Sequence, residues 1–131
     1  MRLMMKDFCL EHPIGFDLLV KIGEVLGRAG VNIEGLSMTT FEDQVVVHFA
    51  VEDAIRAENA LGSAGLKIKA LTDVFVLDKD QKGLTGTSGS FGEICKTLSD
   101  QGIQINFGYP AENNRFIFGV SDVEKAQVLF R

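Results

Sequence analysis

A glycine-rich stretch in the second half of the chain has the residue types of a small-ligand loop. It reads Gly83-Leu84-Thr85-Gly86-Thr87-Ser88-Gly89, and a predicted helix follows directly. Glycines let the backbone approach a ligand closely, and the free amides at a helix N-terminus favour an anion such as a carboxylate. Thr87, Ser88 and Gly89 are therefore candidate ligand contacts, while simple turn formation is the competing interpretation of the two hydroxyls.

The start of that helix carries a capping-box pattern, Ser90-Phe91-Gly92-Glu93. In a capping box the serine side chain accepts a hydrogen bond from the backbone N–H three residues on, and the glutamate side chain reaches back to the serine N–H. We therefore predict that Ser90 caps the helix, with a ligand contact as the less favoured role.

Two side-chain amides occupy matching places after two predicted helices. Asn32 lies in Gly30-Val31-Asn32-Ile33, and Gln104 lies in Gly102-Ile103-Gln104-Ile105. Each can present its amide to a ligand or bond to the neighbouring backbone. The sequence leaves both roles open, so Asn32 and Gln104 are candidate ligand-binding residues.

Residues suited to catalysis are sparse. The chain has two histidines, no closely spaced Cys-His pair and no metal-ligand cluster. The Gly83-x-x-Gly86-x-x-Gly89 spacing lacks the lysine of a P-loop and is not the dinucleotide fingerprint. His48 alternates with Val47 in an apolar run, so it faces away from that residue, toward solvent or a partner sheet. We expect no catalytic activity, no metal and no cofactor.

An internal repeat positions these candidates. Three residues of the first half, Ile22, Leu26 and Gly30, recur 72 positions later as Ile94, Leu98 and Gly102. Further on, Phe49-Ala50-Val51-Glu52-Asp53 recurs after 69 positions as Phe118-Gly119-Val120-Ser121-Asp122, so the intervening hairpin is three residues shorter. Such a repeat indicates one structural unit used twice, over residues 1–71 and 72–131.

Each copy predicts the order strand, helix, strand, strand, helix. In the first copy we expect strands at 2–10, from 31 onward, 45–51 and 66–71, a turn at Glu42-Asp43, one helix ending at Gly30 and one opening near Glu52-Asp53. In the second copy we expect strands near 73–78, 103–109 and 115–120 and helices near 90–101 and 122–130, with no fourth strand. The predicted class is α+β: two ferredoxin-like βαββαβ units in tandem, the second without its last strand, with antiparallel sheets and helices on one face.

Composition narrows the partners and the location. The net charge of −5 has the wrong sign for attracting nucleic acid or an anionic membrane surface. Cys9 and Cys95 do not form a disulfide pattern, so we expect free thiols in a reducing compartment. The N-terminus lacks the apolar run of a secretory signal, and no stretch has the length of a membrane span. A cytoplasmic protein is expected.

The chain resembles the ACT family of amino-acid-sensing regulatory modules, specifically small stand-alone proteins with two ACT units. Gly30-Val31-Asn32-Ile33-Glu34 matches the element that opens the family's second strand, and Gly102-Ile103-Gln104-Ile105-Asn106 matches it with a glutamine for the asparagine. The family's Pro-Gly turn falls here on Phe16-Asp17 and on Ser88-Gly89. The glycine-rich stretch is also similar to a loop in the regulatory region of aspartate kinases.

The resemblance implies a ligand between the first-strand loop of one unit and the second-strand start of its neighbour. In the first copy that loop includes Pro13 and Gly15, slightly earlier than the family pattern, and His12 stands where the family often offers a polar group. His12 and Gly15 thus join the candidate ligand-binding residues, with a solvated surface position as the alternative for His12.

Two functions remain in view at this stage. The leading hypothesis is a regulatory sensor that binds an amino acid or related small carboxylate and acts through ACT–ACT association, as a homodimer. The alternative is a protein-interaction module that binds no ligand and regulates an amino-acid biosynthetic enzyme. An undetected small enzyme on the same scaffold ranks last, because fold does not fix function.

Overall fold

The computed structural model describes residues 5–131, and the chain divides into two compact units, Met1–Thr72 and Asp73–Arg131. The described residues form antiparallel sheets and four helices, so the predicted α+β class is confirmed. Each unit is described by itself below. No helix within residues 5–131 has the length and apolar character needed to cross a membrane.

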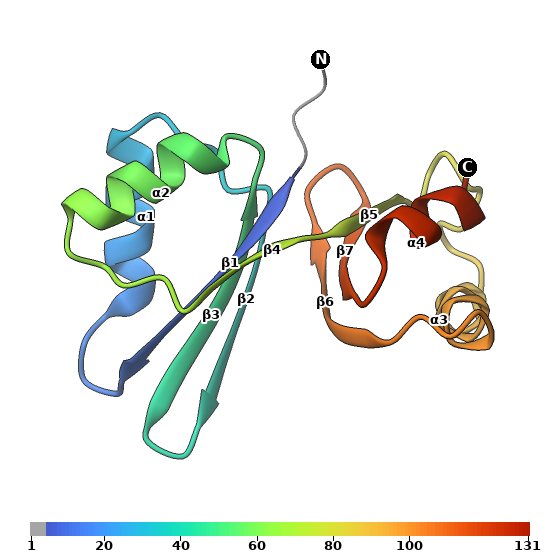
Figure 1. Ribbon diagram of the computed structural model, residues 1–131, viewed down its shortest axis with the longest axis horizontal. Helices are drawn as coiled ribbons and strands as arrows, with labels where there is room; N and C mark the ends of the chain where they lie inside the picture. The colour runs from blue at the N-terminus through green and yellow to red at the C-terminus, as the bar shows by residue number, and fades with distance from the viewer. Residues whose placement is uncertain (1–4) are drawn as a thin grey trace. The chain divides into compact units, whose positions relative to one another are not determined.

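Unit 1 contains four strands and two helices (Figure 1). In chain order they are β1 (Lys6–Pro13), α1 (Leu18–Arg28), β2 (Gly35–Phe41), β3 (Gln44–Val51), α2 (Ala54–Ser63) and β4 (Ala70–Asp73). The strands lie in the order β4-β1-β3-β2, with β3 antiparallel to both β1 and β2. β1 and β3 are thus neighbours in the sheet, although α1 and β2 lie between them in the chain.

The core of unit 1 lies between one sheet face and the two helices. Phe8 on β1 faces Phe49 on β3, and their rings stack at 5.2 Å. The helices contribute fully buried side chains from their apolar stripes, among them Ile22 and Leu26 of α1 and Leu61 of α2. Alternation along the strands places Phe8 on this face and Asp7 on the other.

Unit 2 repeats the pattern without a fourth strand among its described residues. Its elements are β5 (Phe75–Asp78), α3 (Ser90–Asp100), β6 (Ile105–Ala111), β7 (Arg115–Val120) and α4 (Val123–Leu129). The strands lie in the order β6-β7-β5, and β7 is antiparallel to both neighbours. Phe75 and Phe118 are register partners whose rings stack at 5.9 Å, and Leu98 of α3 packs in the same core.

Glycines end the first helix of each unit in the same way. Gly30 has a φ of 72°, and the amide of Val31 donates to the carbonyl oxygen of Leu26 at 2.9 Å. In unit 2, Gly102 has a φ of 74°, and Ile103 donates to Leu98 at 2.9 Å. This is the six-to-one bond of a Schellman cap, and it needs a left-handed residue that glycine adopts without strain.

Three predicted boundaries need correction or qualification. The second strand was expected from residue 31 but begins at Gly35, because the Val31 amide is used in the helix cap and cannot begin a strand ladder. The first strand was expected at 2–10; residues 2–4 lie outside the described part, and β1 continues to Pro13. The fourth strand, expected at 66–71, begins only at Ala70. The predicted turn at Glu42-Asp43 is confirmed, since β2 ends at Phe41 and β3 starts at Gln44.

Candidate functional site

The loop from Lys79 to Gly89, here called the unit-2 loop, joins β5 to α3 and is built from successive turns. Thr87 N–H donates to the Leu84 carbonyl at 3.3 Å, and Ser90 N–H donates to the Thr87 carbonyl at 3.3 Å. Gly86 is the third residue of the first turn and Gly89 is the third residue of the second, with φ of 75° and 81°. A type II turn requires positive φ at that position, so the turns explain the glycine spacing.

A cluster of polar side chains fixes the base of this loop. The Asp80 carboxylate accepts hydrogen bonds from the Thr85 hydroxyl and from the Asn114 side-chain amide, both at 2.8 Å. Asn114 belongs to the β6–β7 turn, and its carbonyl also accepts from Lys79 N–H at 3.2 Å. Hydrogen bonds from Thr85 and Asn114 hold the pKa of Asp80 below its ordinary value. The loop is therefore held to a hairpin of its own unit.

The helix start after the loop differs from the prediction for Ser90. The N-cap of α3 is Gly89, in a left-handed conformation, and no side chain accepts a hydrogen bond there. Ser90 is the first helical residue, and its hydroxyl donates to the Leu84 carbonyl at 3.2 Å. The capping-box prediction is wrong because Ser90 lies one position inside the helix, where its hydroxyl closes the loop instead.

A pocket of about 450 Å³ lies against this loop and helix start. Its polar lining includes Thr87 and Ser88, two of the predicted candidates, which the structure places together. Its remaining lining residues, three of them aromatic or proline, are Lys79, Leu84, Thr85, Gly86, Ser90, Phe91, Pro110 and Phe116. The pocket thus combines hydroxyls and a lysine with an apolar wall, an arrangement typical of small-ligand sites.

Unit 1 has a different residue at the corresponding helix start. Asp17, which is 72 positions before Gly89, is the N-cap of α1, and its carboxylate accepts from Val20 N–H at 3.3 Å. Asp53 and Asp122 cap α2 and α4 in the same way. Among the four described helices, α3 alone starts without a side-chain cap. Unit 1 therefore supplies internally the carboxylate that unit 2 lacks.

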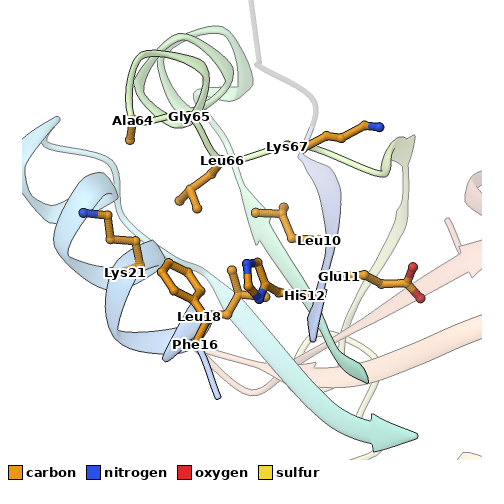
Figure 2. Close-up of a pocket in the computed structure, with 10 residues that line it drawn as sticks. All are labelled: Leu10, Glu11, His12, Phe16, Leu18, Lys21, Ala64, Gly65, Leu66 and Lys67. Atoms are coloured by element: carbon orange, nitrogen blue, oxygen red, sulfur yellow. The ribbon is translucent and has the colours of Figure 1, made fainter. Parts of the chain in front are cut away.

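A second pocket, of about 390 Å³, lies in unit 1 (Figure 2). The end of β1, the start of α1 and the α2–β4 turn line it, and His12 is one of its residues. The His12 ring lies against the Phe16 ring at a centroid distance of 4.3 Å, and its Nδ1 lies 3.0 Å from the Pro13 carbonyl oxygen. The His12 candidate is thus in a concave site, but in the other unit from Thr87 and Ser88.

The remaining candidates line neither of these pockets. Gly15 is exposed in the β1–α1 loop with a φ of 110°, a conformation that favours glycine. Asn32 is exposed between α1 and β2. Gln104 is exposed before β6, and its backbone N–H donates to the Ser121 hydroxyl at 2.9 Å. Gly89, the N-cap of α3, also lines neither pocket, and a ligand role for all four residues remains a prediction.

Sequence reasoning missed several residues that build the unit-2 pocket. The sequence pattern identifies Phe91 only as part of a capping box, and Pro110 and Phe116 reach the loop from β6 and β7. Phe91 and Phe116 pack edge to face at 5.0 Å. The half-exposed Phe91 at a helix start was an available signal, whereas the approach of the hairpin depends on tertiary structure.

The cysteines and His48 offer no catalytic arrangement in the described structure. Both cysteines are free thiols, and burial raises the pKa of each, which keeps them protonated. His48 faces away from Val47, as predicted, and its Nδ1 lies 2.8 Å from the buried carboxylate of Asp7. No group of three histidine, cysteine or acidic side chains within residues 5–131 is arranged to hold a metal ion.

Comparison with solved structures shows that the chain shares its α+β fold with proteins of known structure. It is similar to protein BT0572 from Bacteroides thetaiotaomicron, with a TM-score of 0.72, 22% identity, and 98% of this chain and 86% of that chain covered. It is also similar to the regulatory subunit of aspartate kinase from Thermus thermophilus, with a TM-score of 0.69, 16% identity and coverage of 98% and 89%. The corresponding subunit from Thermus flavus has a TM-score of 0.70, 17% identity and coverage of 98% and 90%. No protein-family profile and no curated protein matches the sequence.

Proposed function

We propose that this protein is a regulatory sensor that binds an amino acid or a related small carboxylate in the unit-2 pocket. The observation that carries the proposal is the start of α3, which lacks a side-chain cap and adjoins a pocket of about 450 Å³. In unit 1 the equivalent helix start is occupied by the carboxylate of Asp17. A ligand carboxylate would take the same role in unit 2.

The pocket chemistry supports a carboxylate with an apolar group. First-turn amides of a helix and its positive dipole end favour an anion, and the hydroxyls of Thr87 and Ser88 add donors. Lys79 contributes a positive charge at the same pocket, and Phe91 and Phe116 form an apolar wall. Asp80 is not among the lining residues, and its carboxylate accepts hydrogen bonds from Thr85 and Asn114 at the base of the loop.

The fold supports a regulatory role. Two of the similar structures are regulatory subunits of aspartate kinases, and the sequence carries the ACT pattern in both halves. The protein would act in the cytoplasm, either as a homodimer whose ACT units associate differently with ligand or on an amino-acid biosynthetic enzyme. A ligand shifts such an equilibrium only by its differential affinity for the two states.

Exposed apolar side chains in unit 1 support the second candidate, an interaction module without a ligand. Ile14, Met38 and Phe41 are 55%, 50% and 67% exposed. Ile14 N–H donates to the Asp43 carbonyl at 2.9 Å, so the β1–α1 loop lies beside the β2–β3 turn that follows Phe41. Ile14 and Phe41 thus lie on neighbouring segments, and exposed apolar residues grouped in this way are typical of protein-binding surfaces. This candidate predicts partner binding that needs no small molecule.

The test is thermal unfolding of the purified protein with a panel of common amino acids at millimolar concentration. A ligand that binds only the folded state raises the midpoint by mass action. We expect a selective rise with one member or a few related members. If no amino acid or small carboxylate raises the midpoint, the sensor proposal fails in favour of the interaction module.

The variant Gly89→Asp tests where the ligand binds, because it copies Asp17 into unit 2. An internal carboxylate at the α3 start should repel and replace the ligand carboxylate and weaken binding at least about tenfold. The control is Gly83→Asp, which introduces the same side chain at a positive φ of 65° in the same loop but not at the N-cap of α3. Equal loss of binding in both variants would contradict the proposed location.

A further inference from the structure

We propose that unit 1 holds a second small-molecule site, in the pocket of about 390 Å³ beside His12, for an organic anion with a compact aromatic body such as an arylalkyl carboxylate. This site is separate from the unit-2 pocket and does not depend on its proposed function. It holds its ligand by apolar contact and by lysine charges, since the α1 start is already capped by Asp17.

The floor of the pocket is apolar and preformed. Leu10 of β1 and Leu18 of α1 are 1% and 3% exposed, and Leu66 of the α2–β4 turn extends toward them (Figure 2). The turn is fixed by Gly65, which has a φ of 75°, and by a 2.9 Å hydrogen bond from Leu66 N–H to the Leu61 carbonyl. The floor is thus formed by a strand, a helix and a hydrogen-bonded turn, all of which are already ordered. Binding therefore requires little further ordering of the protein.

One wall of the pocket is aromatic. The rings of His12 and Phe16 lie 4.3 Å apart with an interplanar angle of 31°, and Figure 2 shows them together next to Leu18. Phe16 is 39% exposed, so its ring presents apolar surface to the pocket opening. An aromatic ligand ring gains by stacking on such a pair and by covering surface that now faces water.

The charge of the rim favours an anion. Lys21 and Lys67 line the pocket, and neither ammonium group has an ion-pair partner in the described part of the chain. Glu11, the one acidic lining residue, is neutralised by its hydrogen-bonded ion pair with Lys69 at 2.5 Å. In Figure 2 the two lysines stand on opposite sides of the leucine floor, with their ammonium groups directed away from it. Flexible lysine stems allow both ammonium groups to approach an anion above that floor.

The test is titration of the ¹⁵N-labelled full chain with 3-phenylpropionate, followed by backbone amide chemical shifts. We expect shifts concentrated at residues 10–21 and 64–67. The neutral 3-phenylpropan-1-ol should bind more weakly, by roughly three- to tenfold, because it lacks the charge. The proposal is overturned if no amide shifts appear at 3-phenylpropionate concentrations of up to about 10 mM. It is also overturned if the alcohol binds as tightly as the carboxylate.

Variants locate the contacts. The double variant Lys21→Gln/Lys67→Gln should weaken 3-phenylpropionate binding roughly three- to tenfold, while the matched double variant Lys82→Gln/Lys96→Gln in unit 2 should not. Ala64→Phe, at an exposed position on the pocket rim, should block the pocket without disturbing the core. The Gly89→Asp variant must retain binding. Loss of binding there, or shifts confined to residues 79–91, would place the probe in the unit-2 pocket and refute a separate site.

Discussion

Replacing Gly119 with alanine is expected to destabilise unit 2 through a steric conflict across the β6–β7 pair. Gly119 is the register partner of Phe107, and the Phe107 ring lies over the glycine. A Cβ at Gly119 would lie 2.2 Å from Cε2 and 2.3 Å from Cζ of Phe107. The backbone at Gly119 does not have the positive φ that would strain an alanine, so the conflict is between side chains alone.

The magnitude follows from the movement that the ring must make. Carbon atoms in contact rest about 3.5 Å apart or more, so the ring must withdraw by more than about 1 Å. It then leaves its preferred rotamer or its stacked position on Tyr109, at 6.2 Å. Overpacking of this kind costs about 1–3 kcal/mol, and the lower chain entropy of alanine offsets about 0.4–1 kcal/mol. The expected net loss is about 1–2 kcal/mol.

The assay is urea unfolding followed by far-UV circular dichroism, in a double-mutant cycle with Phe107→Ala. Without the ring, Gly119→Ala should be neutral or slightly stabilising, so the coupling equals the overpacking cost of about 1–3 kcal/mol. The control is Gly23→Ala on α1, where a Cβ meets nothing within 4 Å and helix propensity should add up to about 1 kcal/mol. Equal effects of Gly119→Ala with and without the Phe107 ring would refute the steric reasoning.

Three further predictions concern charge, packing and reactivity. The folded-state pKa of Asp80 lies below its ordinary value. The Asp80 carboxylate therefore stabilises the loop fully above the ordinary pKa, and this stabilisation is lost as the pH falls through the lowered pKa. The Asn114 side-chain amide signal should report the loss in an acid titration, and a loss near neutral pH would contradict the prediction. Leu26→Ala and Leu98→Ala, at equivalent fully buried positions, should each cost about 2–5 kcal/mol in thermal or urea unfolding, and a cost below about 1 kcal/mol at either would show that the site is not close-packed. Cys9 should react slowly with a thiol reagent in the native protein and rapidly in urea, since burial raises its pKa; fast native labelling would indicate an open strand.

Much of the fold could be predicted from the sequence because local rules and the repeat agree. Gly30 and Gly102 mark helix ends at equivalent positions, and both are left-handed cap residues. The same local rule explains the main error, since the cap uses the Val31 amide and delays the second strand. The capping-box pattern at Ser90 failed for a related reason, because Gly89 had already taken the N-cap position.

The pockets were less accessible to sequence reasoning. Thr87 and Ser88 do lie together in a pocket, but its apolar wall includes Pro110 and Phe116, which follow the loop by more than 20 positions. The unit-1 pocket likewise joins His12 to the α2–β4 turn, about 50 positions away. Such approaches depend on strand order and helix packing, which local spacing does not encode.

The helix starts at equivalent positions of the two units carry different N-cap residues, Asp17 in α1 and Gly89 in α3. In unit 1 the helix start is capped by a carboxylate of the chain itself, whereas in unit 2 it has no side-chain cap. The N-cap of α1 has φ and ψ of −81° and 78°, whereas that of α3 has 81° and −8°. The two helix starts therefore differ in backbone conformation as well as in the capping group, so a ligand carboxylate at α3 would contact amides that follow a left-handed Gly89.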